Sequence, residues 1–97
     1  MFELRYTPAA KKYFKKLKEK GLINAYNSTL DHIEADPYAG ELKIGDLTGI
    51  YCWDVYYSGV NYEIAYQIIE EDKQLVVIIL AGTRENCYEE LKRYMDS

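Results

Sequence analysis

Three strand-like segments in close succession constrain the fold more than any other feature of this sequence. Residues 50–57 and 62–69 alternate apolar and polar side chains, which is the pattern of a half-buried strand. Residues 75–81 are apolar throughout, which is typical of a strand that is buried on both faces and therefore central. Short turn sequences, Ser58-Gly59 and a charged stretch at 70–73, separate the three segments. Because turns this short join antiparallel neighbours, the sequence predicts an antiparallel meander.

A strand and a helical hairpin are predicted ahead of the meander. Residues 2–6 alternate in the manner of a half-buried strand. Thr7 and Pro8 then supply a helix N-cap and a proline at the first helical position. Gly21 is expected to end this helix as its C′ residue. A second, antiparallel helix is predicted over residues 22–35, because Pro37 disfavours helical geometry in the residue before it.

A crossing loop and a closing helix complete the predicted fold. Residues 37–47 hold a proline and two glycines, so we expect a loop that leads from the helices to the sheet. The last helix is expected to begin near Thr83 or Asn86, since Asn86 and Glu89 match a capping box. The predicted fold is one α+β domain over residues 1–97. Its order is β-α-α-β-β-β-α, with the helical hairpin packed on one face of the sheet and a C-terminal helix. Four residues should be mostly buried in it: Trp53, Tyr66, Val77 and Ile79.

Composition restricts the functions that are open to this chain. Its 97 residues support one small core, and the 11 tyrosines against 2 phenylalanines indicate a core with polar aromatic edges. Such rings can stack on RNA bases or simply fill strands. The net charge is −4, but residues 1–20 hold seven basic and two acidic residues, a net +5, so the remainder carries −9. A basic arm of this kind can face nucleic acid, or it can be the solvated surface of a helix.

The cysteines, the single histidine and the hydropathy pattern exclude other classes. Cys52 and Cys87 lack metal-ligand spacing and are too few for a disulfide framework, so we expect buried free thiols and no metal site. His32 is expected to be partly buried or to cap a helix. No apolar run approaches the ~20 residues that span a membrane, and no signal peptide is expected. The sequence therefore predicts a cytoplasmic protein that needs no cofactor and binds no membrane.

The second half of the chain resembles the toxin component of the RelE/ParE toxin–antitoxin superfamily. The residues that carry the resemblance are few: Leu47, Gly49, the strand at 62–66, Arg84 and Tyr88. The order of the predicted elements agrees with that family over nearly all of the chain. The resemblance implies a RelE-like fold and the toxin of a type II toxin–antitoxin system, with a small antitoxin as its partner. The resemblance to the RNA-cleaving members also implies that this chain acts on mRNA and the ribosome.

The same resemblance indicates which residues would carry RNA cleavage. Cleavage without a metal needs a base for the ribose 2′-hydroxyl, a cation for the phosphate and an acid for the departing 5′-oxygen. Arg84 resembles the family's phosphate-holding arginine, although it can also form a surface ion pair. Tyr88 resembles its late tyrosine, although it can also be a helix-edge aromatic. RelE-type sequences carry basic residues on the middle strands, whereas this chain has Asp54 and Glu63. The base can be Glu63, or Glu41 or Asp46 in the loop that leads to the sheet. Otherwise Glu63 is a carboxylate that solvates an outer face of the sheet.

Four more residues are candidates for RNA binding. Lys43 lies in the loop that leads into the sheet, and Tyr57 ends the first strand of the meander. Lys11 and Lys15 belong to the basic first helix, whose lysines can contact ribosomal RNA or simply solvate the helix.

Three functions are consistent with these features. The first is a ribosome-associated, metal-independent endoribonuclease toxin that cleaves mRNA. The second is a ParE-like toxin that binds a protein target such as gyrase without enzymatic activity, and the loss of basic strand residues favours it. The third is a non-toxic binding module of the same fold. We expect the groove between the sheet and the C-terminal corner to bind the antitoxin, preferably through a basic segment that complements an acidic toxin.

Overall fold

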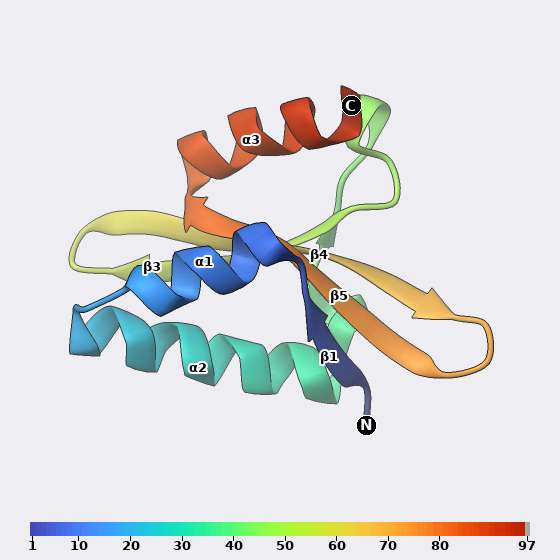
Figure 1. Cartoon of the computed structure of the whole chain (residues 1–97), viewed down its shortest axis with the longest axis horizontal. Coiled ribbons are helices and arrows are strands. Elements are labelled where there is room, and N and C mark those ends of the chain that lie inside the picture. The colour runs from blue at the N-terminus through green and yellow to red at the C-terminus, as the bar shows by residue number, and fades with distance from the viewer. Residues whose placement is uncertain (97) are drawn as a thin grey trace.

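The computed structural model describes residues 1–96 and contains a five-stranded sheet in the order β1-β5-β4-β3-β2, with three α-helices (Figure 1). β3, β4 and β5 form the predicted antiparallel meander, and β1 runs parallel to β5. The α+β class is thereby confirmed. The strands are β1 (Glu3–Tyr6), β2 (Glu41–Leu42), β3 (Tyr51–Tyr57), β4 (Val60–Glu70) and β5 (Gln74–Thr83). The helices are α1 (Pro8–Lys16), α2 (Lys20–Ala35) and α3 (Arg84–Asp96).

A short strand and two 3-10 helices occupy the segment that the sequence predicts as a loop. β2 pairs with the start of β3 over two residues, and the 3-10 helices η1 (Pro37–Ala39) and η2 (Gly45–Leu47) flank it. A strand of two residues has no alternation that a sequence pattern can reveal. The loop prediction was therefore incomplete at this point. Within residues 1–96, no helix has the length and apolar character needed to cross a membrane.

The helices cover both faces of the sheet. α1 and α2 pack on one face, as predicted for the hairpin, and α3 packs on the other (Figure 1). The larger core lies on the hairpin face and includes Tyr26, Ile64 and Ile78. A smaller core lies on the α3 face and includes Cys87 and Leu91. The sheet thus separates two apolar layers: α1 and α2 cover one, and α3 covers the other.

The start of the hairpin agrees with the sequence, but its turn does not. The Thr7 hydroxyl caps α1 by accepting a hydrogen bond from the backbone N–H of Ala10 at 3.1 Å. α1 ends at Lys16, and Gly21 lies in the first turn of α2 instead of closing α1. Gly21 has a different role, because a Cβ there would collide with the ring of Tyr57 unless that ring moved. Its small size lets α2 approach β3 closely.

α3 begins directly after β5, with no loop between them. The Thr83 hydroxyl accepts a hydrogen bond from the backbone N–H of Asn86 at 3.3 Å, so Thr83 ends the strand and also caps the helix. The capping box predicted from Asn86 and Glu89 is therefore wrong. The consequence for the site is that Arg84 occupies the first position of α3.

The burial of the central residues follows the predicted faces. Tyr66 and Ile79 are fully buried, while Trp53 and Val77 are half-buried. The indole of Trp53 is stacked against the imidazole of His32, with 6.2 Å between the ring centroids. His32 itself is exposed, so the predicted partial burial of this histidine is wrong.

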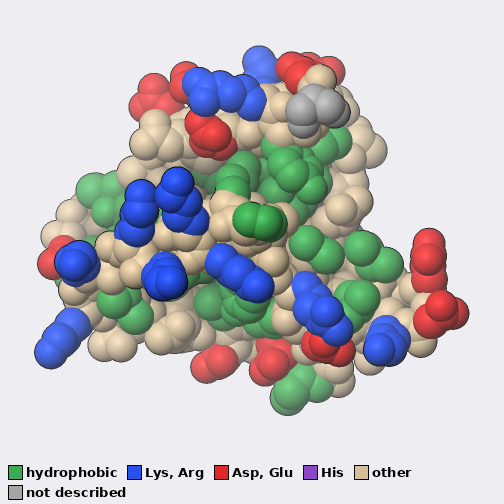
Figure 2. All heavy atoms as spheres, in the orientation of Figure 1, with side chains coloured by type: hydrophobic (Ala, Val, Ile, Leu, Met, Phe, Trp, Pro, Cys, Tyr) green, Lys and Arg blue, Asp and Glu red, His purple; other side chains and the backbone are tan. Residues whose placement is uncertain are grey.

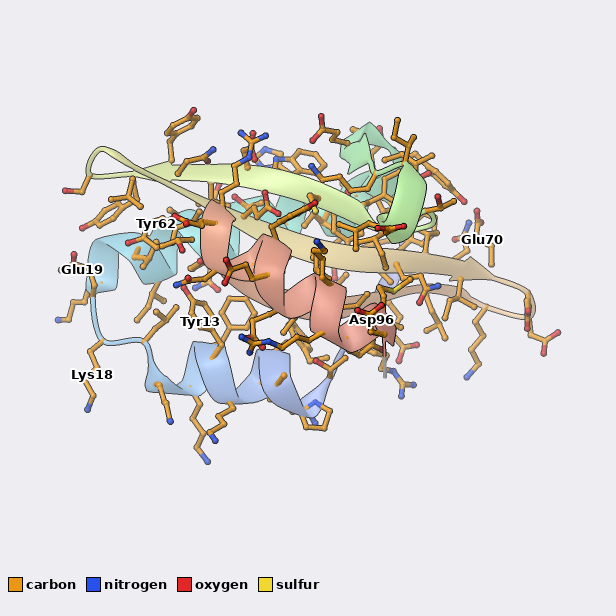
Figure 3. All side chains as sticks on the ribbon, turned by 90° about the horizontal axis from the view of Figure 1, so that it is seen from above. Tyr13, Lys18, Glu19, Tyr62, Glu70 and Asp96 are labelled. Carbon is orange, nitrogen blue, oxygen red and sulfur yellow. The ribbon has the colours of Figure 1, made fainter. Side chains whose placement is uncertain are left out.

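The α1–α2 turn and the β4–β5 turn lie at opposite ends of the molecule. In Figure 3, Lys18 and Glu19 mark the turn between α1 and α2 at one end, and Glu70 marks the β4–β5 turn at the other. At the second end, the hydroxyl of Tyr38 donates a hydrogen bond to the carboxylate of Glu70. This bond ties η1 to the sheet just before the chain enters β2.

A close contact between Gly40 and Tyr66 fixes the same segment, and it gives a testable prediction. The Tyr66 hydroxyl donates a hydrogen bond to the carbonyl of Pro37 at 2.6 Å, and a Cβ at Gly40 would collide with that hydroxyl. We expect Gly40→Ala to lower the free energy of unfolding by about 1–3 kcal/mol, as overpacking usually does. Thermal and urea unfolding measure the loss. In a Tyr66→Phe background the added methyl should cost less, because the obstructing oxygen is gone. An equal cost in both backgrounds would contradict this explanation.

Candidate functional site

A cavity of about 460 Å³ lies where β4, the first turns of α3 and the segment after β2 meet. We call it the Glu63 cavity. Its lining is mostly charged: Lys43, Glu63, Arg84, Glu85 and Tyr88. All of these except Glu85 are candidates that the sequence singles out, and only the fold brings them together.

The alternation of β4 directs Glu63 to the α3 face of the sheet. Its neighbour Ile64 packs in the larger core on the hairpin face, and Ala65 packs in the smaller core beneath α3. Glu63 lies on the same side as Ala65, opposite Asp54 of β3 and Gly82 of β5 in the strand register. α3 covers this part of the sheet, so the interpretation of Glu63 as a solvating surface carboxylate is wrong.

The Glu63 carboxylate is almost inaccessible to water. Only 3% of its side chain is exposed, and among the described residues its buried Oε1 atom has no hydrogen-bond partner. The Nε atom of Arg84 lies 4.0 Å from that oxygen. Burial raises the pKa of Glu63 above its ordinary value, and Asp54 adds to the rise. Cys52, Lys43 and Arg84 oppose it, but the lost hydration dominates.

Arg84 is positioned to meet an anion. It stands at the N-terminus of α3, where free backbone N–H groups and the helix dipole favour negative charge. Its side chain is 57% exposed, so the guanidinium is not enclosed by its contact with Glu63. Arg84 also lines a second cavity of about 310 Å³, to which Glu41, Trp53 and Asp54 contribute. A phosphate bound at Arg84 would therefore adjoin both cavities.

Tyr88 and Lys43 complete the Glu63 cavity from two sides. Tyr88 lies one helical turn after Arg84, is about half exposed, and has the ammonium of Lys92 over its ring at 5.5 Å. Lys43 is half-buried, and its Nζ lies 2.9 Å from Oε1 of Glu41. This contact raises the pKa of Lys43 and lowers the pKa of Glu41, so both groups stay charged at neutral pH.

Three candidates for RNA binding lie away from this cavity. Lys11 and Lys15 are exposed on α1, on the opposite face of the sheet, and Figure 2 shows the basic side chains gathered over that helix. Tyr57 is half-buried at the end of β3, where it packs against Gly21 of α2. The basic face and the Glu63 cavity are therefore on opposite sides of the sheet.

Two cysteines lie beside the site, a placement that the sequence does not predict. Cys52 and Cys87 are free and buried, as predicted, and both pack in the smaller core on the face of the sheet to which Glu63 points. Burial, followed by the negative charge of Glu63, raises the pKa of both thiols, that of Cys87 to about 12. Both thiols therefore stay protonated. Sequence spacing gives no signal of this contact, because it joins β3 and α3 across β4.

The arrangement combines a proton acceptor with positive charge. A buried carboxylate whose pKa is raised can act as a general base closer to neutral pH than an exposed one. Arg84 and Lys43 supply charge for an anion beside it. In the part of the chain that the structure describes, no cluster of His, Cys, Asp and Glu is arranged to hold a metal ion.

The sequence and the fold of this chain are similar to those of known toxins. A family model described as the ParE-like toxin of type II bacterial toxin–antitoxin systems matches residues 4–92. The fold is similar to that of a free mutant form of the Escherichia coli toxin RelE, with a TM-score of 0.72, 23% identity and 96% of each chain covered. It is also similar to a chain of the E. coli RelBE toxin–antitoxin complex, with a TM-score of 0.63 and 22% identity over 86% of this chain and 96% of that one. A chain of the Mycobacterium tuberculosis RelBE2 toxin–antitoxin complex gives a TM-score of 0.65 and 21% identity, with 86% and 98% covered. A search of curated proteins finds no match.

Proposed function

The chain belongs to the ParE-like toxins of type II bacterial toxin–antitoxin systems, and from this premise we propose that it is a metal-independent endoribonuclease that cleaves mRNA at the ribosome. One observation carries the proposal. A buried carboxylate, Glu63, lies beside the exposed cation Arg84 in a cavity that Lys43 and Tyr88 also line. A toxin that acts only by binding a protein has no need of a buried carboxylate with an oxygen that lacks a hydrogen-bond partner, which costs folding free energy.

In the proposed reaction, Glu63 accepts the proton of a ribose 2′-hydroxyl. The 2′-oxygen then forms a bond to the adjacent phosphorus, and the bond from phosphorus to the 5′-oxygen breaks. Arg84 and Lys43 stabilise the negative charge that develops on the phosphate oxygens. The Tyr88 hydroxyl donates a proton to the departing 5′-oxygen. The products are a 2′,3′-cyclic phosphate and a 5′-hydroxyl, and Glu63 and Tyr88 then exchange protons with water to restore their starting states.

This reaction requires Arg84 to turn from the carboxylate towards the phosphate. Its contact with Glu63 is long, at 4.0 Å, and most of its side chain is in solvent, so the rearrangement breaks little. Once the guanidinium moves, the Oε1 atom that has no partner is open to the 2′-hydroxyl.

The test is to induce this chain alone in a bacterial host and to map new RNA 5′ ends. We expect fragments with 5′-hydroxyl ends within mRNA that ribosomes are translating. The purified chain should also cleave mRNA on ribosomes in the presence of a metal chelator. Growth arrest without new 5′ ends would contradict the proposal.

The second candidate function is a ParE-like toxin that inhibits a protein target such as gyrase. The acidic balance of the chain, −4 overall, favours this alternative because it weakens attraction to RNA. The acidic side chains Glu41, Asp54 and Glu85 around Arg84 act in the same direction. A supercoiling assay run beside the RNA assay separates the two functions, and induction without toxicity would instead indicate a binding module that is not toxic.

The antitoxin partner is the second part of the proposal. The RelE-type chains of E. coli and M. tuberculosis occur in toxin–antitoxin complexes, and we expect a cognate antitoxin to cover the groove between the sheet and α3. Because Glu41, Glu63 and Glu85 lie at or beside that groove, the contacting segment should be basic. Co-expression with the neighbouring open reading frame should yield a stable complex, and Glu85→Lys should weaken it and make it less dependent on salt. Equal affinity for Glu85→Lys and the parent chain would place the antitoxin elsewhere.

A further inference from the structure

The interior beneath α3 holds three ionisable side chains in contact with one another. Glu63, Cys52 and Cys87 are each no more than 3% exposed. The proposed cleavage uses only the carboxylate, so the two thiols have no part in it so far. A cysteine can serve merely as a small apolar residue, but here both cysteines are buried on the same face of the sheet as a carboxylate whose buried Oε1 atom has no partner.

The thiols approach Glu63 from two different elements. Cys52 pairs with Ala65 in the register of β3 and β4, so it is diagonal to Glu63 across the strands. Cys87 lies in the first turn of α3, three residues after Arg84, and it packs with Cys52 in the smaller core beneath that helix. Each thiol remains protonated and therefore has one S–H to donate. Glu63 consequently has one thiol near it on the sheet and a second on the helix that covers it.

We propose that Cys52 and Cys87 are positioning residues, whose S–H groups hold the Glu63 carboxylate in the orientation in which it accepts a proton. The catalytic part of this inference rests on the proposed nuclease function, whereas the contact itself does not. A buried carboxylate with no donors is driven towards its neutral form. One that accepts several N–H bonds becomes too weak a base. Two weak S–H donors give an intermediate result: they favour the ionised, oriented carboxylate and leave it basic.

Other charged groups face the same carboxylate or line the Glu63 cavity with it. They are Asp54 from β3, Lys43 from the segment after β2, and Arg84 and Glu85 from α3. None of them is changed in the variants below, so a change in the titration of Glu63 reports on the thiols.

The experiment compares donors of different strength at the same two positions. Serine donates a stronger hydrogen bond than cysteine, whereas alanine and valine donate none. The pKa of Glu63 is followed through the carboxyl ¹³C shift in the full chain without substrate, and cleavage of a short RNA is measured over the same pH range. We expect the pKa to rise in Cys52→Ala and Cys87→Ala and to fall in Cys52→Ser and Cys87→Ser. At pH values below the midpoint of the acid limb of the pH–rate profile, the alanine variants should cleave RNA about three- to tenfold more slowly. This is the effect of one lost hydrogen bond.

Two further variants keep the result interpretable. Cys52→Val leaves no cavity and supplies no donor, so it should shift the titration in the same direction as alanine even if alanine leaves a cavity. Ile79→Val, a change in the same small core, should lower stability without moving the titration. Shifts of the same sign in the alanine and serine variants, or no shift in either, would overturn the inference. Because the titration needs no substrate, opposite shifts support the thiol contact even in a chain that fails to cleave RNA.

Discussion

An Arg84→Ala variant is expected to cleave RNA about 10²–10³-fold more slowly than the parent chain, and to lose its toxicity on induction. Arg84 is the exposed cation at the start of α3 beside the buried Glu63, so it can meet the charge that develops on the phosphate. Removing one preorganised donor typically has an effect of this size. The fold should survive, because a 57% exposed side chain with a 4.0 Å ion pair contributes little stability. Single-turnover cleavage and thermal unfolding measure the two effects.

Arg93→Ala is the matched control. Arg93 is also exposed on α3, but it pairs with Glu90 and does not line the Glu63 cavity, so its loss should leave cleavage and toxicity unchanged. Tyr88→Phe then separates two roles of the tyrosine. The loss should be small if the ring stacks on a base, and nearly as large as for Arg84→Ala if the hydroxyl transfers a proton. Full toxicity of Arg84→Ala, with ribosomes and mRNA intact, would favour the ParE-like binder.

Glu63→Gln is expected to slow cleavage by about 10²–10⁴-fold, the usual contribution of a general base, and to make the fold more stable. The parent chain buries an ionisable carboxyl whose Oε1 atom has no partner. The uncharged amide removes the cost of burying a charge, so we expect the free energy of unfolding to rise by about 1 kcal/mol and Tm by about 4–8 °C at neutral pH. If the carboxylate merely repels phosphate, the same substitution should instead speed cleavage.

Glu63 should make the stability of the fold depend on pH. The pKa of Glu63 is raised in the folded state. Its contribution to stability is therefore fully present below the pKa of an unfolded glutamate, and it is lost as pH rises through the folded-state pKa. Cleavage has the opposite dependence, since the base must be ionised. The Tm advantage of Glu63→Gln should consequently be largest above the folded-state pKa and should shrink in acid. Glu71→Gln, in the exposed β4–β5 turn, is the control that should change neither property.

Most of the fold can be predicted from the sequence because its signals are local. Alternation fixes the faces of β3 and β4, and Thr7 and Pro37 mark the beginning of α1 and the end of α2. The errors occur where a distant contact decides the structure. Gly21 has the sequence context of a helix terminator, but in the structure it lies in the first turn of α2, where the ring of Tyr57 packs against it.

The site is less predictable, and Glu63 shows why. The pattern of β4 places this residue on the face opposite Ile64, but it cannot say whether that face is covered. The covering comes from α3, which returns over the sheet after β5 and brings Cys87 with it. The resemblance to RelE/ParE toxins identifies Arg84 and Tyr88 as separate candidates and does not say how they are arranged in space. That they share a cavity with Lys43 and a buried carboxylate is a property of the folded chain alone.

The small number of side chains that anchor α3 sets a limit on how long the site persists. Of its residues only Cys87 and Leu91 are buried, whereas the sheet beneath is held by the larger core on its other face. Segments with few buried apolar contacts open locally without global unfolding. Opening of α3 alone would carry Arg84 and Tyr88 away and expose Glu63 to water, which would return its proton affinity to that of an ordinary glutamate. The assembled site therefore persists for a shorter time than the fold, and hydrogen exchange of the α3 amides would measure that time.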